Sequence, residues 1–335
     1  MDEWTYEKAG VSIQRADAFV EYIKDRVRSL PGQVHLFGAF ASGVELKSYK
    51  NPVLMLTADG VGTKLKIAQK VGVHHTVGID LVAMNVNDLI TTGAEPLGFL
   101  DYIATGRIDL EVLKRLMDGI VEGCRMAGVP LVGGETAEMP DFYPDGVYDL
   151  AGFCVGACEK ESLITGRNIK PGDVILGLPS SGFHSNGYSL IRKVLEARGI
   201  SYEDYAHEFK KPVWEVLLEP TRIYTEEVKL LKASGVEIKG MAHITGGGVP
   251  GNLIRILPEG CRAVVDSSLL PNNPTFTWIA DLGKVRKEEM FKTFNMGVGF
   301  MLVLEEGWVS RTLSVLEDAF VCGKVESGER DVVIL

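Results

Sequence analysis

The sequence contains few cysteines and no long apolar run, and both absences limit the class of protein. Five cysteines occur in 335 residues, without a CxxC pair, at Cys124, Cys154, Cys158, Cys261 and Cys322. Their odd number and wide spacing, in apolar or glycine-rich surroundings, predict buried thiols rather than a disulfide framework or a zinc site. No apolar stretch reaches the roughly 20 residues of a bilayer span, and no leader pattern opens the chain. We therefore expect a cytoplasmic protein without a membrane partner.

Basic stretches and several catalytic motifs are also missing. The net charge is −10, which argues against a nucleic-acid partner because such a surface needs a basic stripe. The sequence has no G-x-S-x-G elbow and no H-E-x-x-H pair, so a serine hydrolase and a zinc site are poorly supported. The negative net charge does not exclude ATP binding. Salt screens distant charges, so the residues close to a site determine whether it binds ATP.

Length and pattern predict two units of mixed α/β type. The 335 residues correspond to about two domains at ~150 residues each. Turn-forming residues cluster at 165–173, so we place the units at 1–168 and 169–335. We expect strands at 53–56, 77–81, 99–104, 129–132, 148–158, 174–178, 236–244, 261–266 and 296–304. We expect helices at 16–30, 65–71, 82–90, 113–124, 187–198, 220–234 and 307–318. The irregular alternation favours mixed sheets, and hence an α+β fold, over a purely parallel sheet.

The most informative segment is Asp59-Gly60-Val61-Gly62-Thr63-Lys64, which follows the first expected strand. It has neither the spacing of a Walker A loop nor the third glycine of a G-x-G-x-x-G loop. Its carboxylate suits a cation, while its lysine and glycine N–H groups suit a phosphate. The segment is a candidate site for a metal-bound phosphate, and the alternative is a plain strand-ending turn.

A second polar group contains Asp80, Asn85, Asn87 and Asp88. In one interpretation Asp80 caps a helix that starts at Val82, while Asn85 and Asp88 lie on its solvated face. In the other, Asp80 and Asp88 join Asp59 as oxygen ligands of Mg²⁺ around a nucleotide phosphate.

A third loop, Gly133-Gly134-Glu135-Thr136, follows the expected strand at 129–132. One such loop would be an ordinary turn. Three loops of the same chemistry at the ends of neighbouring strands would converge on one site.

The second half offers two further glycine-containing loops. One runs over 180–187 and contains His184 among small polar residues, so this histidine is either a binding or catalytic group or a core residue. The other is His243-Ile244-Thr245-Gly246-Gly247-Gly248, which closes an expected strand. Its glycines would bring N–H groups close to a phosphate or would form a hinge.

Taken in order, these segments resemble the phosphoribosylformylglycinamidine cyclo-ligase family, also called aminoimidazole ribonucleotide synthetases. The similar segments are 6–11, 59–64, 78–88, 93–96, 133–140, 181–190, 220–224 and 243–248. Each is weak alone, but the ordered set spans nearly the whole chain. The resemblance implies ATP-dependent ring closure of formylglycinamidine ribonucleotide to aminoimidazole ribonucleotide, the fifth step of de novo purine synthesis.

The resemblance also implies roles for individual residues. Asp59, Asp80 and Asp88 would bind Mg²⁺ and the ATP phosphates. The other implied ATP contacts are Lys24, Gly60, Gly62, Thr63, Lys64, Asn87, Gly134, Glu135 and Thr136. The implied substrate contacts are Ser181, Gly182, His184, Ser185, Asn186, Thr245, Gly246, Gly247 and Gly248. Asp59, Lys64 and His184 are the implied catalytic residues, with His184 in proton transfer.

The implied architecture is a homodimer of two-domain subunits, in which the N-terminal sheets complete a shared barrel near the ATP. One segment departs from the family pattern, because residues 31–40 keep only part of a glycine-rich loop. That departure puts the geometry of a nucleotide lid in doubt.

Two other functions compete with this reading. A related ATP-using enzyme, such as a thiamine-monophosphate kinase or a selenophosphate synthetase, would lack the His184 loop in this form. A selenophosphate synthetase would also carry a reactive Cys or selenocysteine near its N-terminus, and here none precedes Cys124. A non-catalytic nucleotide sensor would bind ATP without hydrolysing it.

Overall fold

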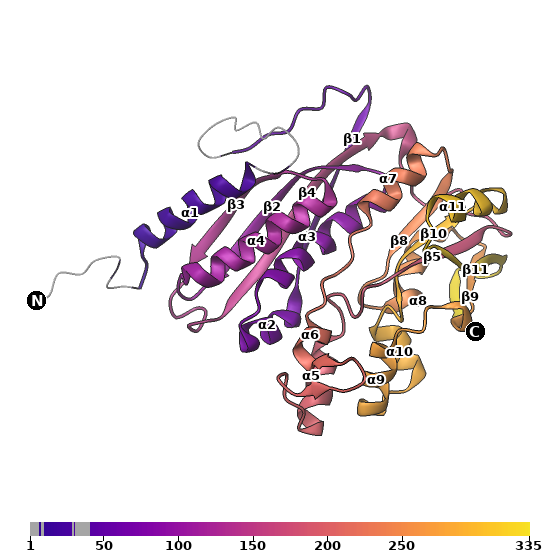
Figure 1. Ribbon diagram of the computed structural model, residues 1–335. Coiled ribbons are helices and arrows are strands. Elements are labelled where there is room, and N and C mark those ends of the chain that lie inside the picture. The colour runs from indigo at the N-terminus through magenta and orange to yellow at the C-terminus, as the bar shows by residue number, and fades with distance from the viewer. Residues whose placement is uncertain (1–6, 8–9, 29, 31–40) are drawn as a thin grey trace, which may run out of the picture.

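Two large β-sheets with helices packed on them form most of the computed structural model, which describes residues 7, 10–28, 30 and 41–335 (Figure 1). A third, small sheet consists of β6 and β7 alone. The helices are α1 (Ile13–Val27), α2 (Leu65–Val71), α3 (His75–Ile90), α4 (Leu110–Ala127), α5 (Tyr188–Arg198), α6 (Val213–Leu217), α7 (Thr225–Ala233), α8 (Gly248–Leu253), α9 (Pro274–Gly283), α10 (Lys287–Thr293) and α11 (Val309–Val315). The strands are β1 (Pro52–Gly60), β2 (Glu95–Thr105), β3 (Leu131–Glu138), β4 (Tyr148–Glu159), β5 (Val174–Pro179), β6 (Tyr205–Ala206), β7 (Lys211–Pro212), β8 (Ile238–His243), β9 (Cys261–Val265), β10 (Val298–Leu304), β11 (Phe320–Ser327) and β12 (Asp331–Ile334).

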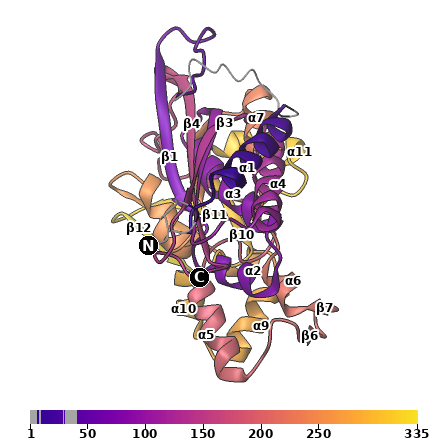
Figure 2. The same cartoon turned by 90° about the vertical axis from the view of Figure 1, so that its left-hand side faces the viewer.

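The N-terminal sheet has four strands in the order β1-β4-β2-β3. β4 pairs antiparallel with β1 and β2, whereas β2 and β3 are parallel. Successive side chains of a strand point to opposite faces, so each strand contributes to two surfaces. One face packs on α3 and α4, which lie together on one side of the sheet in Figure 2.

The C-terminal sheet has six strands in the order β12-β9-β11-β5-β10-β8, and it is buried on both faces. Neighbouring strands are antiparallel except for the parallel pair β9 and β12. All seven residues of β10 are buried, and they alternate between two hydrophobic clusters on opposite faces. Its unbroken apolar sequence follows from that double burial.

The expected fold class is confirmed, and most expected elements are present. The strand expected at 77–81 is wrong, because these residues belong to α3. Fourteen of the sixteen residues of α3 are buried, so its sequence lacks the polar face that normally identifies a helix. The glycines of 133–136 continue β3 instead of following it. The helix expected from 220 starts at Thr225. Eight helices and strands were not expected: α6, α8, α9, α10, β6, β7, β11 and β12.

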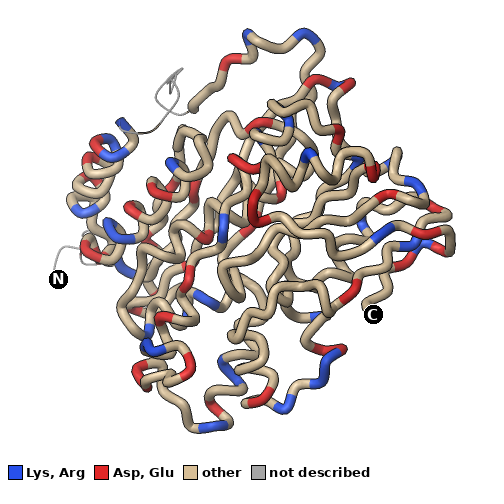
Figure 3. The backbone as a smooth tube through the Cα atoms, turned by 45° about the vertical axis from the view of Figure 1, so that its right-hand side comes forward, with Lys and Arg blue, Asp and Glu red and all other residues tan. Residues whose placement is uncertain are grey.

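Other expectations can be compared with the described residues. All five cysteines are free and buried, as predicted. Among the described residues, no helix combines the length and apolar composition that crossing a membrane requires. Acidic and basic residues are interspersed along the described chain in Figure 3. Residues 31–40, on which the lid expectation rests, lie outside the described part.

Candidate functional site

Two acidic residues and a histidine meet where the two sheets approach each other. Asp59 lies near the end of β1, Asp88 lies on α3, and His243 ends β8. His243 Nδ1 lies 2.7 Å from Asp88 Oδ1, and the histidine side chain is 1% exposed while that of Asp88 is 45% exposed. Burial raises the pKa of Asp59, the nearby Asp88 carboxylate raises it further, and His243 opposes the rise. The three side chains therefore form one electrostatic cluster that is open to solvent at Asp88.

The hydrogen bond to Asp88 defines the chemistry of His243. An ionised carboxylate only accepts hydrogen bonds, so Nδ1 of the ring is the donor. In the neutral ring the other nitrogen, Nε2, then carries a lone pair. It is buried and has no hydrogen-bond partner among the described residues. No role was expected for His243, although its position just before the glycine run 246–248 was the available signal.

His184 is fully buried on the loop between β5 and α5. Its backbone has a φ of 59°, a left-handed conformation that non-glycine residues rarely adopt and that is often found at functional sites. The backbone N–H of Ser181 donates to Nε2 at 3.2 Å, so the neutral ring carries its proton on Nδ1. Burial lowers the pKa of His184 well below its ordinary value, and His243, Lys64 and Arg222 add to this effect. The ring is therefore held neutral.

The neutral ring of His184 offers a hydrogen-bond donor. Its Nδ1 is buried without a partner among the described residues. A buried donor without a partner is costly and calls for a ligand or a water. The expected role of His184 in proton transfer stays a prediction, and the neutral ring is placed to donate a hydrogen bond to an oxygen.

Asn186 connects this loop to the glycine run after β8. A Cβ added at Gly246 would lie 3.6 Å from Asn186 Oδ1, so the two loops are close neighbours. The Nδ2 group of Asn186 is buried without a hydrogen-bond partner among the described residues. Asn252 Nδ2 supports the glycine run by donating to the carbonyls of Thr245, Gly246 and Gly248. The predicted substrate loops thus converge, and they present unused donors.

The remaining polar groups of the His184 loop are used within the protein. The Ser181 hydroxyl donates to the Pro220 carbonyl at 2.5 Å, and the Gly182 carbonyl accepts from Asn295 Nδ2 at 2.9 Å. Ser185 Oγ lies 3.3 Å from Thr221 Oγ1. These contacts fix the loop against its surroundings.

Lys64 and Asp80 lie in the interior and not on the expected phosphate path. Both side chains are fully buried, and Lys64 Nζ lies 2.7 Å from Asp80 Oδ2. Nζ also donates to the carbonyls of Glu219 at 2.7 Å and His184 at 3.1 Å. Burial lowers the pKa of Lys64, and Asp80 opposes this shift. Asp80 Oδ1 accepts from the N–H and the hydroxyl of Thr221 at 2.8 and 2.6 Å.

The structure does not bring the three carboxylates of the expected metal site together. Asp80 stands eight residues before Asp88 on α3, about 12 Å along the helix axis, and its carboxylate contacts Lys64 and Thr221. Among the described residues, no group of three or more His, Cys, Asp and Glu side chains is placed to hold a metal ion. Asp80 is also not the cap of a helix, because it lies within α3.

Asn87 and Thr63 also make internal contacts. Asn87 Nδ2 donates to the Arg222 carbonyl at 2.8 Å, and its Oδ1 accepts from the Tyr224 N–H at 3.0 Å. Thr63 Oγ1 lies 3.1 Å from Ser189 Oγ on α5. Both residues thus connect the N-terminal half of the chain to the C-terminal half.

The glycines of the first segment are open to solvent on one side. Gly60 N–H donates to the carboxylate of Asp59 at 2.8 Å. Gly62 has a φ of 71°, and a Cβ added to it would meet no other atom within 4 Å. They lie between Asp59 and Lys64 and lead from the acidic cluster towards the interior.

Glu135 is not brought to the acidic cluster. Cross-strand pairing places Asp59, Gly152, Asp101 and Gly134 in one row across the sheet. Residues paired in this way share a face, and this row faces the helices, so Glu135, next along β3, points to the opposite face. β3 and β1 are the two edges of the sheet, about 14 Å apart at the usual strand spacing. Thr136 and Gly134 lie on the same distant strand.

Lys24 also lies apart from the cluster. It is on α1, where its side chain is 59% exposed and pairs with Glu21 at 2.6 Å. α1 packs on α4 through a hydrogen bond from Tyr22 to Asp118. Within the described residues no contact joins Lys24 to the predicted phosphate residues.

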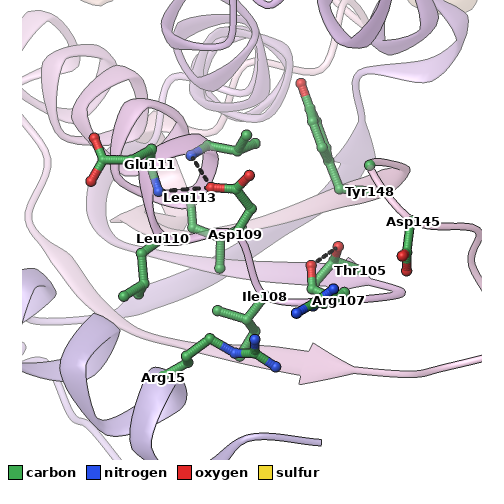
Figure 4. A pocket seen from close by; sticks show the side chains of 12 residues that line it. Arg15, Thr105, Arg107, Ile108, Asp109, Leu110, Glu111, Leu113, Asp145 and Tyr148 are labelled. Carbon is green, nitrogen blue, oxygen red and sulfur yellow. Dashed lines mark hydrogen bonds between the residues drawn. The ribbon is translucent and has the colours of Figure 1, made fainter. Parts of the chain in front are cut away.

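A separate cavity of about 470 Å³ lies beside the N-terminal end of α4 (Figure 4). Arg15, Arg107, Asp109 and Asp145 line it together with apolar side chains. Asp109 caps α4 by accepting from the N–H groups of Glu111 and Val112, and Arg15 pairs with Glu138 at 3.3 Å. None of the predicted site residues lines this cavity.

Comparisons with known proteins cover both halves of the chain. Residues 44–158 match the family described as AIR synthase related protein, N-terminal domain, and residues 170–335 match the corresponding C-terminal domain. A phosphoribosylformylglycinamidine cyclo-ligase of Myxococcus xanthus is 51% identical over 335 residues, covering 97% of this chain and 96% of the relative. One from Caldanaerobacter subterraneus subsp. tengcongensis is 48% identical, covering 98% and 99% of the two chains.

Solved structures of lower identity share the fold. The hydrogenase maturation protein HypE in complex with ATP has a TM-score of 0.69 at 18% identity, covering 95% of this chain and 89% of HypE. A thiamine-monophosphate kinase from Stenotrophomonas maltophilia K279a has a TM-score of 0.68 at 15% identity, covering 95% of both chains.

Proposed function

This chain belongs to the phosphoribosylformylglycinamidine cyclo-ligase family, and we propose which of its residues bind ATP, bind the substrate and transfer protons in that reaction. The enzyme is an ATP-dependent ligase of de novo purine synthesis. It converts formylglycinamidine ribonucleotide and ATP into aminoimidazole ribonucleotide, ADP and phosphate.

The reaction needs an activated oxygen and a well-placed nitrogen. The formyl amide oxygen is a poor leaving group, so it first attacks the γ-phosphorus, and ADP departs. The amidine nitrogen of the same substrate then attacks the activated carbon, loses a proton, and closes the five-membered ring. The C–O bond breaks and the oxygen leaves within inorganic phosphate. Phosphoryl transfer depends on positioning and on charge neutralisation more than on covalent help from the protein.

Asp59 and Asp88 are the residues that fit a divalent cation. Both are carboxylates near each other, and Asp88 raises the pKa of Asp59, an effect that a bound cation would relieve. Mg²⁺ commonly takes one or two carboxylates together with phosphate oxygens and waters, and Asp88 is exposed enough to accept this arrangement. When bound, Mg²⁺ would neutralise charge on the transferring phosphoryl group. Gly60 and Gly62 would give the phosphates a close approach to the chain.

The substrate side is built from hydrogen-bond donors. The observation that carries this proposal is the pair of buried, unpartnered donors at His184 Nδ1 and Asn186 Nδ2. The glycine run beside Asn186 adds backbone N–H groups that suit a phosphate. A donor-only surface recognises oxygens, such as those of the substrate's phosphate and of the reacting amide.

His243 is the best-placed acceptor for the amidine proton. Asp88 orients its ring, and its buried Nε2 carries a lone pair with no partner among the described residues. A base held by a carboxylate and facing a site is the arrangement used for general base catalysis. His184 then acts as donor and His243 as acceptor.

The placement of these residues gives each half of the chain a separate role in the proposal. We assign ATP binding and dimerisation to 1–168, and completion of the substrate site to 169–335. Homodimer formation is supported by the sheet face opposite α3 and α4, where Leu54, Leu56 and Phe153 are 49%, 71% and 43% exposed. Large exposed apolar patches usually mark an interface. A second copy could also bring Glu135, Thr136 or Lys24 towards the ATP. The charged metabolites that the enzyme uses place the reaction in the cytoplasm.

The direct test supplies the purified protein with Mg-ATP and formylglycinamidine ribonucleotide. We expect ADP and aminoimidazole ribonucleotide in equal amounts. Release of ADP without the aminoimidazole product would reject the cyclo-ligase and favour a related kinase. ATP that binds but is never hydrolysed would favour a nucleotide sensor. Omitting the ribonucleotide is the control for uncoupled hydrolysis.

A further inference from the structure

The buried pair formed by Lys64 and Asp80 joins chain segments from both halves of the molecule. Lys64 precedes α2, and Asp80 lies on α3, both in the N-terminal half. Their remaining partners, the carbonyls of His184 and Glu219 and the polar groups of Thr221, all come from the C-terminal half. Four separate segments therefore meet at one ion pair.

The Lys64 ammonium is already surrounded by oxygens of the protein, two of which accept hydrogen bonds from it. An ammonium group has three N–H donors, and Lys64 Nζ has three oxygen neighbours, at Asp80, Glu219 and His184, within 2.7 to 3.1 Å. The Tyr188 ring lies 5.5 Å from Nζ and adds a further favourable contact. A phosphate that bound Lys64 would have to displace one of these partners and reach a side chain with no exposed surface. The geometry therefore assigns the lysine to the protein and not to the nucleotide.

The contact from Lys64 to His184 acts on a strained residue. His184 has a φ of 59°, and such a conformation persists only where the surroundings enforce it. The ammonium of Lys64 holds the carbonyl of this residue, while the Ser181 N–H holds its ring. Together the two bonds set the direction of Nδ1. Loss of the first would let the residue relax towards an ordinary backbone conformation and turn the ring away.

The 219–224 segment is held in the same way along α3. Thr221 bonds to Asp80, and seven residues later Asn87 bonds to the backbone of Arg222 and Tyr224. Residues seven apart lie on the same face of a helix. α3 therefore carries two polar anchors on one face, both directed at the segment that supports the His184 loop.

We propose that Lys64 and Asp80 are positioning residues, which fix the His184 backbone and the 219–221 segment across the junction of the two halves. This proposal rests on the proposed role of the His184 loop in substrate binding. Buried ion pairs contribute little net stability compared with apolar residues of the same volume, so their value here is geometric. The proposal replaces the phosphate and metal roles that the resemblance implied for these two residues.

The first test compares kcat with the KM values of the Lys64→Met variant. Methionine keeps the length of the side chain and removes the charge. We expect kcat to fall about 100-fold, as for a displaced catalytic group, with the KM for ATP within about threefold of the parent protein. Lys66→Met, on an exposed lysine two residues away, is the matched control and should behave as the parent. A KM for ATP raised tenfold or more with unchanged kcat would overturn the proposal in favour of a phosphate ligand.

The second test separates positioning from mere folding. Lys64→Met alone leaves Asp80 buried and unpaired, so it is expected to lower the melting temperature. The double variant Lys64→Met with Asp80→Leu replaces the pair by apolar side chains and should recover the melting temperature, while kcat stays low. If kcat recovers together with the melting temperature, the pair has a structural role only and the proposal fails.

The third test asks whether Lys64 acts through His184. The double variant His184→Ala with Lys64→Met should have a kcat within about threefold of that of His184→Ala alone. The reason is that the group positioned by Lys64 is already absent. Full additivity of the two effects would overturn the proposal. If the parent protein itself forms no aminoimidazole product, the proposed function fails, and that outcome is distinct from any of the variant results.

Discussion

Asp101 carries the clearest pH dependence in the structure. It lies on β2 in the row that faces the helices, only 6% exposed, between Gly152 on β4 and Gly134 on β3. Burial raises its pKa from 3.8 to about 7, and the neighbouring Glu135 adds to the rise. A Cβ at Gly134 would lie 2.2 Å from its Oδ1, so the carboxyl group fills the space that this glycine leaves.

The sign and size of the effect follow from linkage. In the unfolded chain the carboxyl ionises near 3.8, and in the folded chain it ionises near 7. Between these values the folded state holds the extra proton, so the stability falls as the pH rises through this window. The full loss is about 4 kcal/mol at 1.36 kcal/mol per pKa unit, and roughly 2.5 kcal/mol of it falls between pH 5 and pH 8.

Replacing Asp101 with Asn should remove this dependence, because the amide has the shape of the protonated acid and does not ionise. Urea unfolding followed by circular dichroism at pH 5 and pH 8 measures the difference. From pH 5 to pH 8, we expect the free energy of unfolding of the variant to rise by roughly 2.5 kcal/mol relative to that of the parent protein. Asp17→Asn, on an exposed aspartate of α1, is the control and should leave the parent's pH dependence unchanged. A constant difference between Asp101→Asn and the parent at both pH values would refute the reasoning.

Three further substitutions test the site and the surfaces around it. His184→Ala should lower kcat about 100-fold or more by removing a buried donor, and an undiminished steady-state rate would remove this residue from the site. Leu56→Lys should shift the sedimentation coefficient of the protein to that of a monomer, because the change charges the exposed apolar face of β1; a dimer that persists would place the interface elsewhere. Gly134→Ala should lower the free energy of unfolding by about 1–3 kcal/mol because of the clash with Asp101, and urea unfolding at pH 5 without such a loss would contradict the contact.

Local sequence patterns predicted the parts of the fold that depend on local periodicity. Amphipathic α4 and the apolar strands β5 and β10 were recognisable because one period or one apolar run dominates each of them. α3 was misread because it is buried on nearly all sides, and residues 77–81, with apolar side chains at every second position, look like a strand. The glycines of β3 were read as a loop, although they stay in the strand to make room for neighbours such as Asp101.

The site was predictable as a set of residues and not as a set of contacts. The segment from Asp59 to Lys64 was identified by its chemistry, but the chain turns through a short 3-10 helix between the two ends. Asp59 consequently faces Asp88, whereas Lys64 enters the interior. Nothing in the sequence gives the direction of that turn. The partnership of His243 with Asp88 was equally hidden, because 155 positions separate the two residues.

Residue types that suit phosphate or metal binding can also hold the two halves of the chain together when they are buried. A site at the junction of two halves needs the halves to meet in one fixed arrangement. Apolar contacts tolerate small slips, whereas a buried ammonium, carboxylate or amide is costly unless each of its hydrogen bonds is made. Lys64, Asp80 and Asn87 all bond across the junction, so a slip would leave several buried polar groups without partners at once. The residues that specify the arrangement are then the same types that bind phosphate and metal. These aspartates differ in exposure, because Asp88 is open to solvent and Asp80 is fully enclosed.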